Sequence, residues 1–119
     1  MENLQSAQSS RKEYLFATAI AGRQYYDADD AWPYLHVGTR LRMAYEPDNS
    51  QDDNAVSLYL DNDGRAYKLG YLPRQDNEFV AVMIKAGWQE AFECVVSRID
   101  PSESYAKQIG ITVKIVCRN

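Results

Sequence analysis

Apolar and polar side chains alternate with a period of two along several short segments of this chain. That alternation is typical of half-buried β-strands. It predicts strands at residues 39–45, 55–60, 67–72, 91–99 and 109–117. Asp, Asn and Gly occupy residues 61–64, a strong turn signal that makes the second and third of these strands a hairpin. Residues 14–20 favour a sixth strand, although their Ala and Leu leave a helix open.

The period changes after Pro73. Four apolar residues then recur at helical spacing and form one stripe: Phe79, Val80, Met83 and Ile84. The pattern predicts a helix over about residues 75–86, with Asp76 or Asn77 as a cap at its start. Gly87 stands where a C′ glycine ends a helix.

A short helical turn is expected within residues 26–35, with Asp27 near its N-cap and Pro33 limiting its length. Six strands and one main helix define a β-rich α+β protein. The length of 119 residues corresponds to one domain. We expect a polar N-terminal tail at residues 1–12 and a single domain at 13–119.

The charge balance limits the classes of partner. The formal net charge is −4 and the sequence pI is about 4.9, whereas proteins that wrap duplex DNA are usually basic. A small site with a few local cations is still compatible with this charge, but its nucleic-acid affinity should be modest and salt-sensitive. The chain also holds nine tyrosines, which suit half-buried strands and surfaces that stack on bases.

Three motifs carry the most specific information. Residues 45–56 read Tyr-Glu-Pro-Asp-Asn-Ser-Gln-Asp-Asp-Asn-Ala-Val, residues 69–74 read Leu-Gly-Tyr-Leu-Pro-Arg, and residues 22–26 read Gly-Arg-Gln-Tyr-Tyr. The first begins like an EF-hand loop, but Asp53 replaces the required Gly and Tyr59 replaces the bidentate Glu, which excludes that calcium site. In order and spacing the three motifs resemble the HIRAN domain, over roughly residues 14–99.

The resemblance implies an OB-like six-stranded β-barrel that binds single-stranded DNA at a free 3′-hydroxyl end. The aspartate that matches Asp52 accepts a hydrogen bond from the 3′-hydroxyl in this family. A carboxylate there accepts from a hydroxyl and repels a phosphate, so it selects a free end. Of the two tyrosines that match Tyr25 and Tyr26, one stacks on the terminal base and the next bonds a phosphate. Packing of both rings at a strand end is the alternative.

Four further residues are candidates for the same site. Tyr71 and Arg74 match a polar ring and a cation of the family, and Arg74 could hold a phosphate with the N–H groups at the start of the predicted helix. A solvated charge is the alternative for Arg74. Arg23 could also bond phosphate, and Asn54 belongs to the same loop, where it could instead hold the backbone.

Two positions depart from the family pattern. Gln51 stands where members that bind DNA ends carry a second aromatic, and Gln24 stands where they carry an arginine. Losing one face of a base sandwich costs roughly 1–3 kcal/mol. The fold is therefore better supported than tight DNA binding.

Nothing in the sequence indicates catalysis or a cofactor. His36 is alone and no phosphate-loop motif is present, so we expect a non-catalytic module. The resemblance to the HIRAN domain implies a role in DNA repair, with a separate helicase or nuclease as a partner. A protein-interaction adaptor that uses the same tyrosine-rich surface is the alternative function. No segment has the pattern of a secretory signal or a membrane span, which favours a cytoplasmic location.

The two cysteines, Cys94 and Cys117, lie in apolar segments without metal-ligand spacing. We therefore predict two free thiols and no bound zinc in the purified protein. Thiol titration under denaturing conditions and metal analysis test this; stoichiometric zinc, or the absence of titratable thiol, would refute it.

Overall fold

The structure is a computed structural model that describes residues 11–117. Its strands are β1 (Arg11–Ala19), β2 (Arg40–Tyr45), β3 (Val56–Asn62), β4 (Arg65–Tyr71), β5 (Phe92–Ile99) and β6 (Ile109–Cys117). The α-helices are α2 (Ala28–Ala31) and α3 (Arg74–Lys85). Short 3-10 turns occur at η1 (Arg23–Tyr25), η2 (Trp32–Tyr34), η3 (Gln89–Ala91) and η4 (Tyr105–Lys107). Within the described range, no helix is long and apolar enough to cross a membrane.

The strands and the main helix agree with the sequence pattern to within a few residues at each end. The segment left open between strand and helix is a strand, β1. Because β1 begins at Arg11, the last two residues of the predicted tail belong to the sheet, and residues 1–10 of that tail lie outside the described residues. Both cysteines carry free thiols.

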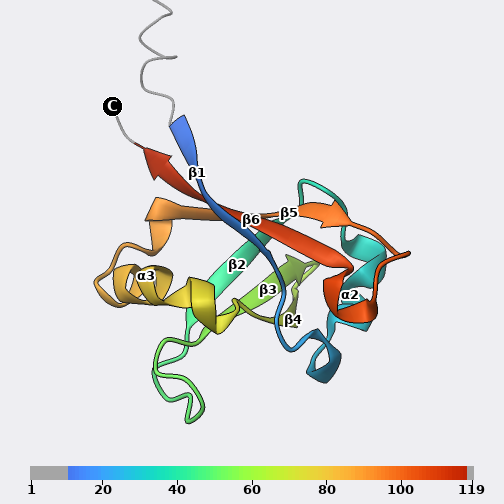
Figure 1. Cartoon of the computed structure of the whole chain (residues 1–119), viewed down its shortest axis with the longest axis horizontal. Helices are drawn as coiled ribbons and strands as arrows, with labels where there is room; N and C mark the ends of the chain where they lie inside the picture. Colours follow the sequence, from blue (N-terminus) through green and yellow to red (C-terminus); the bar gives the residue numbers. More distant parts are fainter. Residues whose placement is uncertain (1–10, 118–119) are drawn as a thin grey trace, which may run out of the picture.

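All six strands form one antiparallel sheet in the order β1-β6-β5-β2-β3-β4. Figure 1 shows β1 crossing over β6 on one side of the molecule, with β3 and β4 on the other. The expectation of a barrel is not confirmed, because the sheet is open between its edge strands. The two edges meet in an isolated bridge between Ala21 and Tyr71. The chain leaves the sheet directly after this bridge, where Gly22 has a positive φ of 71° and starts η1.

The apolar faces of the strands enclose a single core. Leu58, Leu69, Ile111 and Val113 are fully buried in it, and α3 contributes Val80 and Ala81. In Figure 1, α3 lies beside the sheet at one end and α2 lies at the other. The core therefore fixes the position of α3 against β2 and β3, which it contacts.

The start of α3 differs from the prediction. Its N-cap is Pro73, without a side-chain cap bond, so neither Asp76 nor Asn77 caps it. Asn77 instead turns inward and is buried. The end agrees with the prediction, since Gly87 has a φ of 97° and its N–H donates to the carbonyl of Ile84.

Strand β4 contains a bulge that reverses its alternation. Leu58 pairs with Gly70, but the next residue, Tyr59, pairs with Lys68, so Leu69 is an extra residue in β4. Residues three apart in a regular strand point to opposite faces. The bulge brings Lys68 and Tyr71 to the same face, where the Lys68 Nζ lies 2.8 Å from the Tyr71 hydroxyl oxygen.

Gly70 allows the two sheet edges to approach. Its φ is 145°, and a Cβ there would collide with the carbonyl oxygen of Ala21 and lie 2.7 Å from the Cγ2 of Ile20. Only glycine therefore fits beside the Ala21–Tyr71 bridge.

We expect Gly70→Ala to lower the free energy of unfolding by about 2–3 kcal/mol, because it adds both backbone strain and a collision. The control is Gly64→Ala, which has a φ of 82° but open space around the added Cβ. It should cost about 1–2 kcal/mol from the backbone alone. Urea unfolding measures both values, and equal losses would contradict the close approach at Gly70.

Candidate nucleic-acid interface

A cavity of about 480 Å³ lies where three distant parts of the chain meet. These parts are the turn after β1, the acidic loop between β2 and β3, and the junction of β4 with α3. The lining residues are Ala21, Gly22, Tyr25, Tyr26, Asn49, Gln51, Asp52, Ala55, Tyr71, Leu72 and Arg74. Five of the seven predicted site residues, all except Arg23 and Asn54, are among them.

Tyr25 and Tyr26 lie on one wall of the cavity. They do not lie on an extended segment, because η1 includes Tyr25 and Tyr26 is its C-cap. Both rings are exposed, Tyr25 by 74% and Tyr26 by 39%. They meet edge to face with centroids 6.5 Å apart, and Tyr26 also meets Tyr71 at 5.7 Å. The face of Tyr25 is therefore accessible for stacking.

The acidic loop on the opposite wall is held by its own side chains. The Asn49 Oδ1 accepts the backbone N–H groups of Gln51, at 2.8 Å, and of Asp52, at 3.1 Å. This turn chemistry is common for Asn. It fixes the backbone on which Gln51 and Asp52 face the cavity.

Two hydrogen bonds hold the Asp52 carboxylate in one orientation. Its Oδ2 accepts a hydrogen bond from the Nδ2 of Asn77 at 2.8 Å, and its Oδ1 accepts the N–H of Asn54 at 2.9 Å. Asn77 comes from α3 and is only 2% exposed. A carboxylate has about four lone-pair sites, so Asp52 keeps acceptor capacity toward the cavity. Asn54 contributes through its backbone and does not line the cavity.

Arg74 is the first residue of α3, and its side chain connects this helix to the acidic loop. Its Nη2 donates to the carbonyl oxygen of Gln51 at 2.5 Å, and its Nε lies 3.8 Å from the Oδ2 of Asp52. The side chain is still 70% exposed. Arg74 is the cationic side chain that lines this cavity, within the part of the chain that the structure describes.

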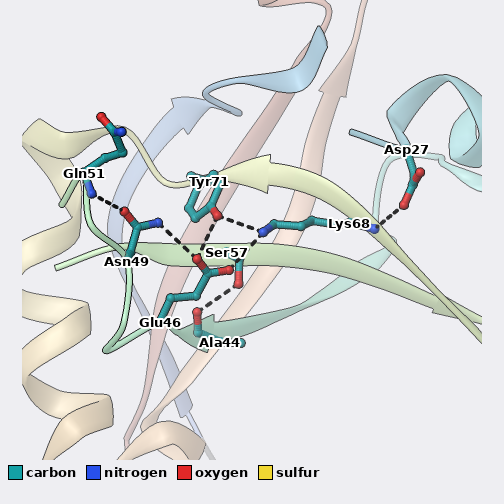
Figure 2. Close-up of polar contacts among 8 residues, drawn as sticks. All are labelled: Asp27, Ala44, Glu46, Asn49, Gln51, Ser57, Lys68 and Tyr71. Carbon is teal, nitrogen blue, oxygen red and sulfur yellow. Dashed lines mark hydrogen bonds and ion pairs between the residues drawn. The ribbon is translucent and has the colours of Figure 1, made fainter. Parts of the chain in front are cut away.

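A polar cluster surrounds the Tyr71 hydroxyl, as Figure 2 shows. The Glu46 carboxylate accepts hydrogen bonds from the Tyr71 hydroxyl at 2.7 Å, from the Lys68 Nζ at 3.0 Å and from the Asn49 Nδ2 at 3.1 Å. The Lys68 Nζ also lies 4.7 Å from the Tyr26 ring centroid and 4.6 Å from that of Tyr71. This ammonium therefore sits close to both rings and is paired with a carboxylate.

The cluster shifts the pKa values of its members. Partial burial works against the charge of Glu46, but the hydrogen bonds from Tyr71, Lys68 and Asn49 outweigh it and lower its pKa to about 2. Burial likewise opposes the charge of Lys68, yet its hydrogen bonds with Tyr71 and Glu46 raise the pKa of the ammonium. Burial, together with the hydrogen bond to Glu46, raises the pKa of Tyr71 to about 12. Glu46 and Lys68 are thus both charged at neutral pH, and Tyr71 keeps its proton.

The structure does not place Arg23 in the cavity. Its side chain is only 3% exposed and points toward the loop between β5 and β6. The expectation that it bonds phosphate therefore needs a correction: its Nη1 donates to the carbonyl of Tyr105 and to the Oε1 of Gln108, both at 2.7 Å.

A second groove, of about 1,030 Å³, is lined mainly by residues of β2 and β5. Its cations are already paired: Glu93 binds Lys12 at 2.7 Å and Arg40 at 3.0 Å, and Arg42 binds Asp61 at 2.7 Å. The groove is larger, but it lacks the combination of an accessible ring and a pinned carboxylate found in the smaller cavity.

Comparison with known proteins defines the family. The HIRAN domain profile matches residues 14–117, nearly the whole chain. The chain therefore belongs to the HIRAN domain family, and the HIRAN domain is a nucleic-acid-binding module.

A search of solved structures agrees on the fold. The crystal structure of a Lactobacillus plantarum protein, determined as a structural genomics target, matches with a TM-score of 0.74 and 22% sequence identity. The match covers 92% of this chain and 100% of that chain. None of the curated proteins searched matches the chain.

Three residues that support the site were not predicted to belong to it: Glu46, Lys68 and Asn77. Glu46 lies within the motif at residues 45–56, but no pattern there indicates that it pairs with Lys68. Lys68 is three residues from Tyr71, a spacing that places them on opposite faces unless a bulge intervenes. A glycine inside a strand is the one signal for such a bulge, and Gly70 provides it.

We predict that Glu46 stabilises the fold in a pH-dependent way. Because its folded pKa of about 2 lies below the ordinary 4.5, its contribution is present above about pH 4.5 and is lost as the pH falls through about 2. Between about pH 6 and about pH 2, the free energy of unfolding of the wild type should fall about 1–3 kcal/mol more than that of Glu46→Gln.

Urea unfolding at a series of pH values measures this difference. Glu78→Gln, which removes the same charge from an exposed position of α3, is the control and should follow the wild type. Parallel curves for wild type and Glu46→Gln would contradict the role of the cluster.

Proposed function

We propose that this HIRAN domain binds single-stranded DNA at a free 3′-hydroxyl end, in the cavity between Tyr25 and Asp52, without catalysing a reaction. The observation that carries the proposal is the pairing of an accessible tyrosine face with a carboxylate held by a buried amide. Nucleic-acid modules use the same two chemistries, a stacking ring and a defined acceptor.

Asp52 would select the end of the strand. A carboxylate accepts a hydrogen bond from a terminal hydroxyl and repels the phosphate of a continuing chain. The hydrogen bond from Asn77 supports this role, because it fixes one oxygen while the carboxylate retains free lone pairs. A pinned acceptor loses little side-chain entropy when the strand binds.

Tyr25 would stack on the terminal base, since its ring is the more exposed of the pair. Gln51 provides no second ring, so we expect weaker binding than a two-sided sandwich would give, by roughly 1–3 kcal/mol. The Tyr71 hydroxyl already bonds Glu46 and Lys68. We therefore assign Tyr71 to the wall of the site and not to a phosphate.

Phosphate binding would depend on Arg74 and on the N–H groups of the first turn of α3. A helix N-terminus favours an anion, and α3 has 12 residues. Arg74 is the one cation among the described residues that line the cavity. Because the net charge is also −4, the affinity should be modest and should fall with salt.

A domain that only binds the end needs a second protein to act on it. We propose a separate helicase or nuclease, in a DNA-repair setting in the cytoplasm. A protein partner at the tyrosine-rich surface is the competing function, and it becomes the better one if single strands fail to bind.

We expect the wild type to bind a strand with a free 3′-hydroxyl at least about tenfold more tightly than the same strand with a 3′-phosphate, because a charge-assisted hydrogen bond is replaced by repulsion. Asp52→Asn should remove most of this discrimination. Fluorescence anisotropy with 5′-labelled oligonucleotides, at low and high salt, measures the ratio.

The matched control is Asp53→Asn. It removes the same charge from the same loop at an exposed residue that does not line the cavity. The control should keep the wild-type ratio. Equal binding of the two strands by the wild type would rule out end recognition.

A further inference from the structure

Arg23 is a buried charge that ties together three segments. Its guanidinium lies between the Tyr105 ring, with 3.9 Å from Cζ to the centroid, and the Trp32 ring, at 5.0 Å. Its Nη1 holds the Tyr105 carbonyl and the Gln108 side chain, and its Nη2 lies 3.6 Å from Asp29. Burying a charge is costly even when hydrogen bonds and an ion pair offset part of the penalty, so this arrangement calls for a reason beyond packing.

Residues 22–26 form a turn, here called the tyrosine turn, and the backbone of Arg23 helps to close it. Its carbonyl accepts the N–H of Tyr26 at 3.4 Å, and the neighbouring Gly22 carbonyl accepts the N–H of Tyr25 at 3.1 Å. The flanks of the turn are fixed by backbone bonds: Ala21 to Tyr71, and the Asp27 N–H to the Lys68 carbonyl at 2.7 Å. Arg23 supplies a side-chain anchor between these two flanks.

The Arg23 side chain contacts residues more than 80 positions later in the sequence. Tyr105 and Gln108 belong to the connection between β5 and β6, and neither lines the cavity. Gln108 in turn donates to the carbonyls of Pro101 and Glu103, and the Tyr105 hydroxyl donates to Asp29 at 2.7 Å. The loop is therefore ordered around the guanidinium.

We propose that Arg23 is a positioning residue: through Tyr105 and Gln108 it holds the turn that presents Tyr25 and Tyr26 to the bound strand. The inference rests on the proposed function for its effect on DNA binding. It makes the β5–β6 loop a remote part of the binding site and assigns Arg23 no contact with the strand.

The test is a double-mutant cycle between Arg23→Met and Tyr25→Ala, with a 5′-labelled oligothymidylate of about ten nucleotides bearing a free 3′-hydroxyl. Arg23→Met should weaken binding about tenfold in the wild type, the equivalent of one misplaced stacking ring, and less than about twofold when Tyr25 is already alanine. An equal loss in both backgrounds overturns the proposal.

Salt dependence separates positioning from direct contact. Arg23→Met should leave the slope of log affinity against log salt unchanged, whereas a lost phosphate contact would reduce it by about one. A reduced slope overturns the proposal. The control is Arg65→Met, which removes an exposed arginine that lies 4.1 Å from the Tyr67 ring and 3.5 Å from Asp30, away from the cavity. It should stay within about twofold of the wild type.

A second variant tests the role of Arg23 when the first cannot be purified in folded form. If Arg23→Met does not fold, Tyr105→Leu replaces it, because Tyr105 is 40% exposed and its ring covers Arg23. It should weaken binding in the same direction and be silent in the Tyr25→Ala background, and an effect of equal size in both backgrounds overturns the proposal.

If the wild type does not bind the strand, the proposed function fails on its own, and hydrogen exchange in the free protein decides the inference. Either variant should raise the exchange rates of the Tyr25 and Tyr26 amides about tenfold over those of β3. Unchanged rates overturn it.

Discussion

The bridge between Ala21 and Tyr71 is the constraint on which the candidate site depends. Two backbone hydrogen bonds, of 2.8 and 2.9 Å, join the end of β1 to the end of β4. They form only because Gly70 has no side chain at the point of contact. The bridge sets the tyrosine turn beside β4, and the same stretch of β4 carries the bulge that turns Lys68 and Tyr71 to one face. Without the Ala21–Tyr71 bridge, the wall of the cavity that carries Tyr25 and Tyr26 would have no fixed position.

The polarity of the cavity follows from which charges are satisfied internally. Glu46 and Lys68 neutralise each other beneath the rings, so the ammonium supports Tyr26 and Tyr71 and is not offered to a ligand. Asp52 is oriented by uncharged groups, the amide of Asn77 and a backbone N–H, so its negative charge is retained. Arg74 alone balances it at the mouth, among the described residues that line the cavity. Under the proposed function, this arrangement would favour a hydroxyl over a phosphate at the carboxylate.

The sequence predicted the elements well and the connections between them less well. Alternation and the period switch after Pro73 located the strands and α3, because local burial patterns determine them. The three motifs and the resemblance built on them named five residues that the structure places around one cavity. What could not be predicted depends on long-range contacts. Arg23 follows a glycine in an exposed-looking motif, yet its partners are 82 and 85 residues away. The open sheet likewise depends on a long-range contact, because whether the edge strands β1 and β4 pair along their length is not set by the local pattern of either strand.

NMR mapping with a short single strand that bears a free 3′-hydroxyl tests the location of the site most directly, because the described residues also form a larger groove of different character. We expect the amide resonances of Tyr25, Gln51, Asp52 and Arg74 to shift on titration, while those of Arg40 and Gln89, in the larger groove, stay in place. Shifts confined to the larger groove, or spread evenly over the surface, would contradict the assignment of the tyrosine cavity as the nucleic-acid interface.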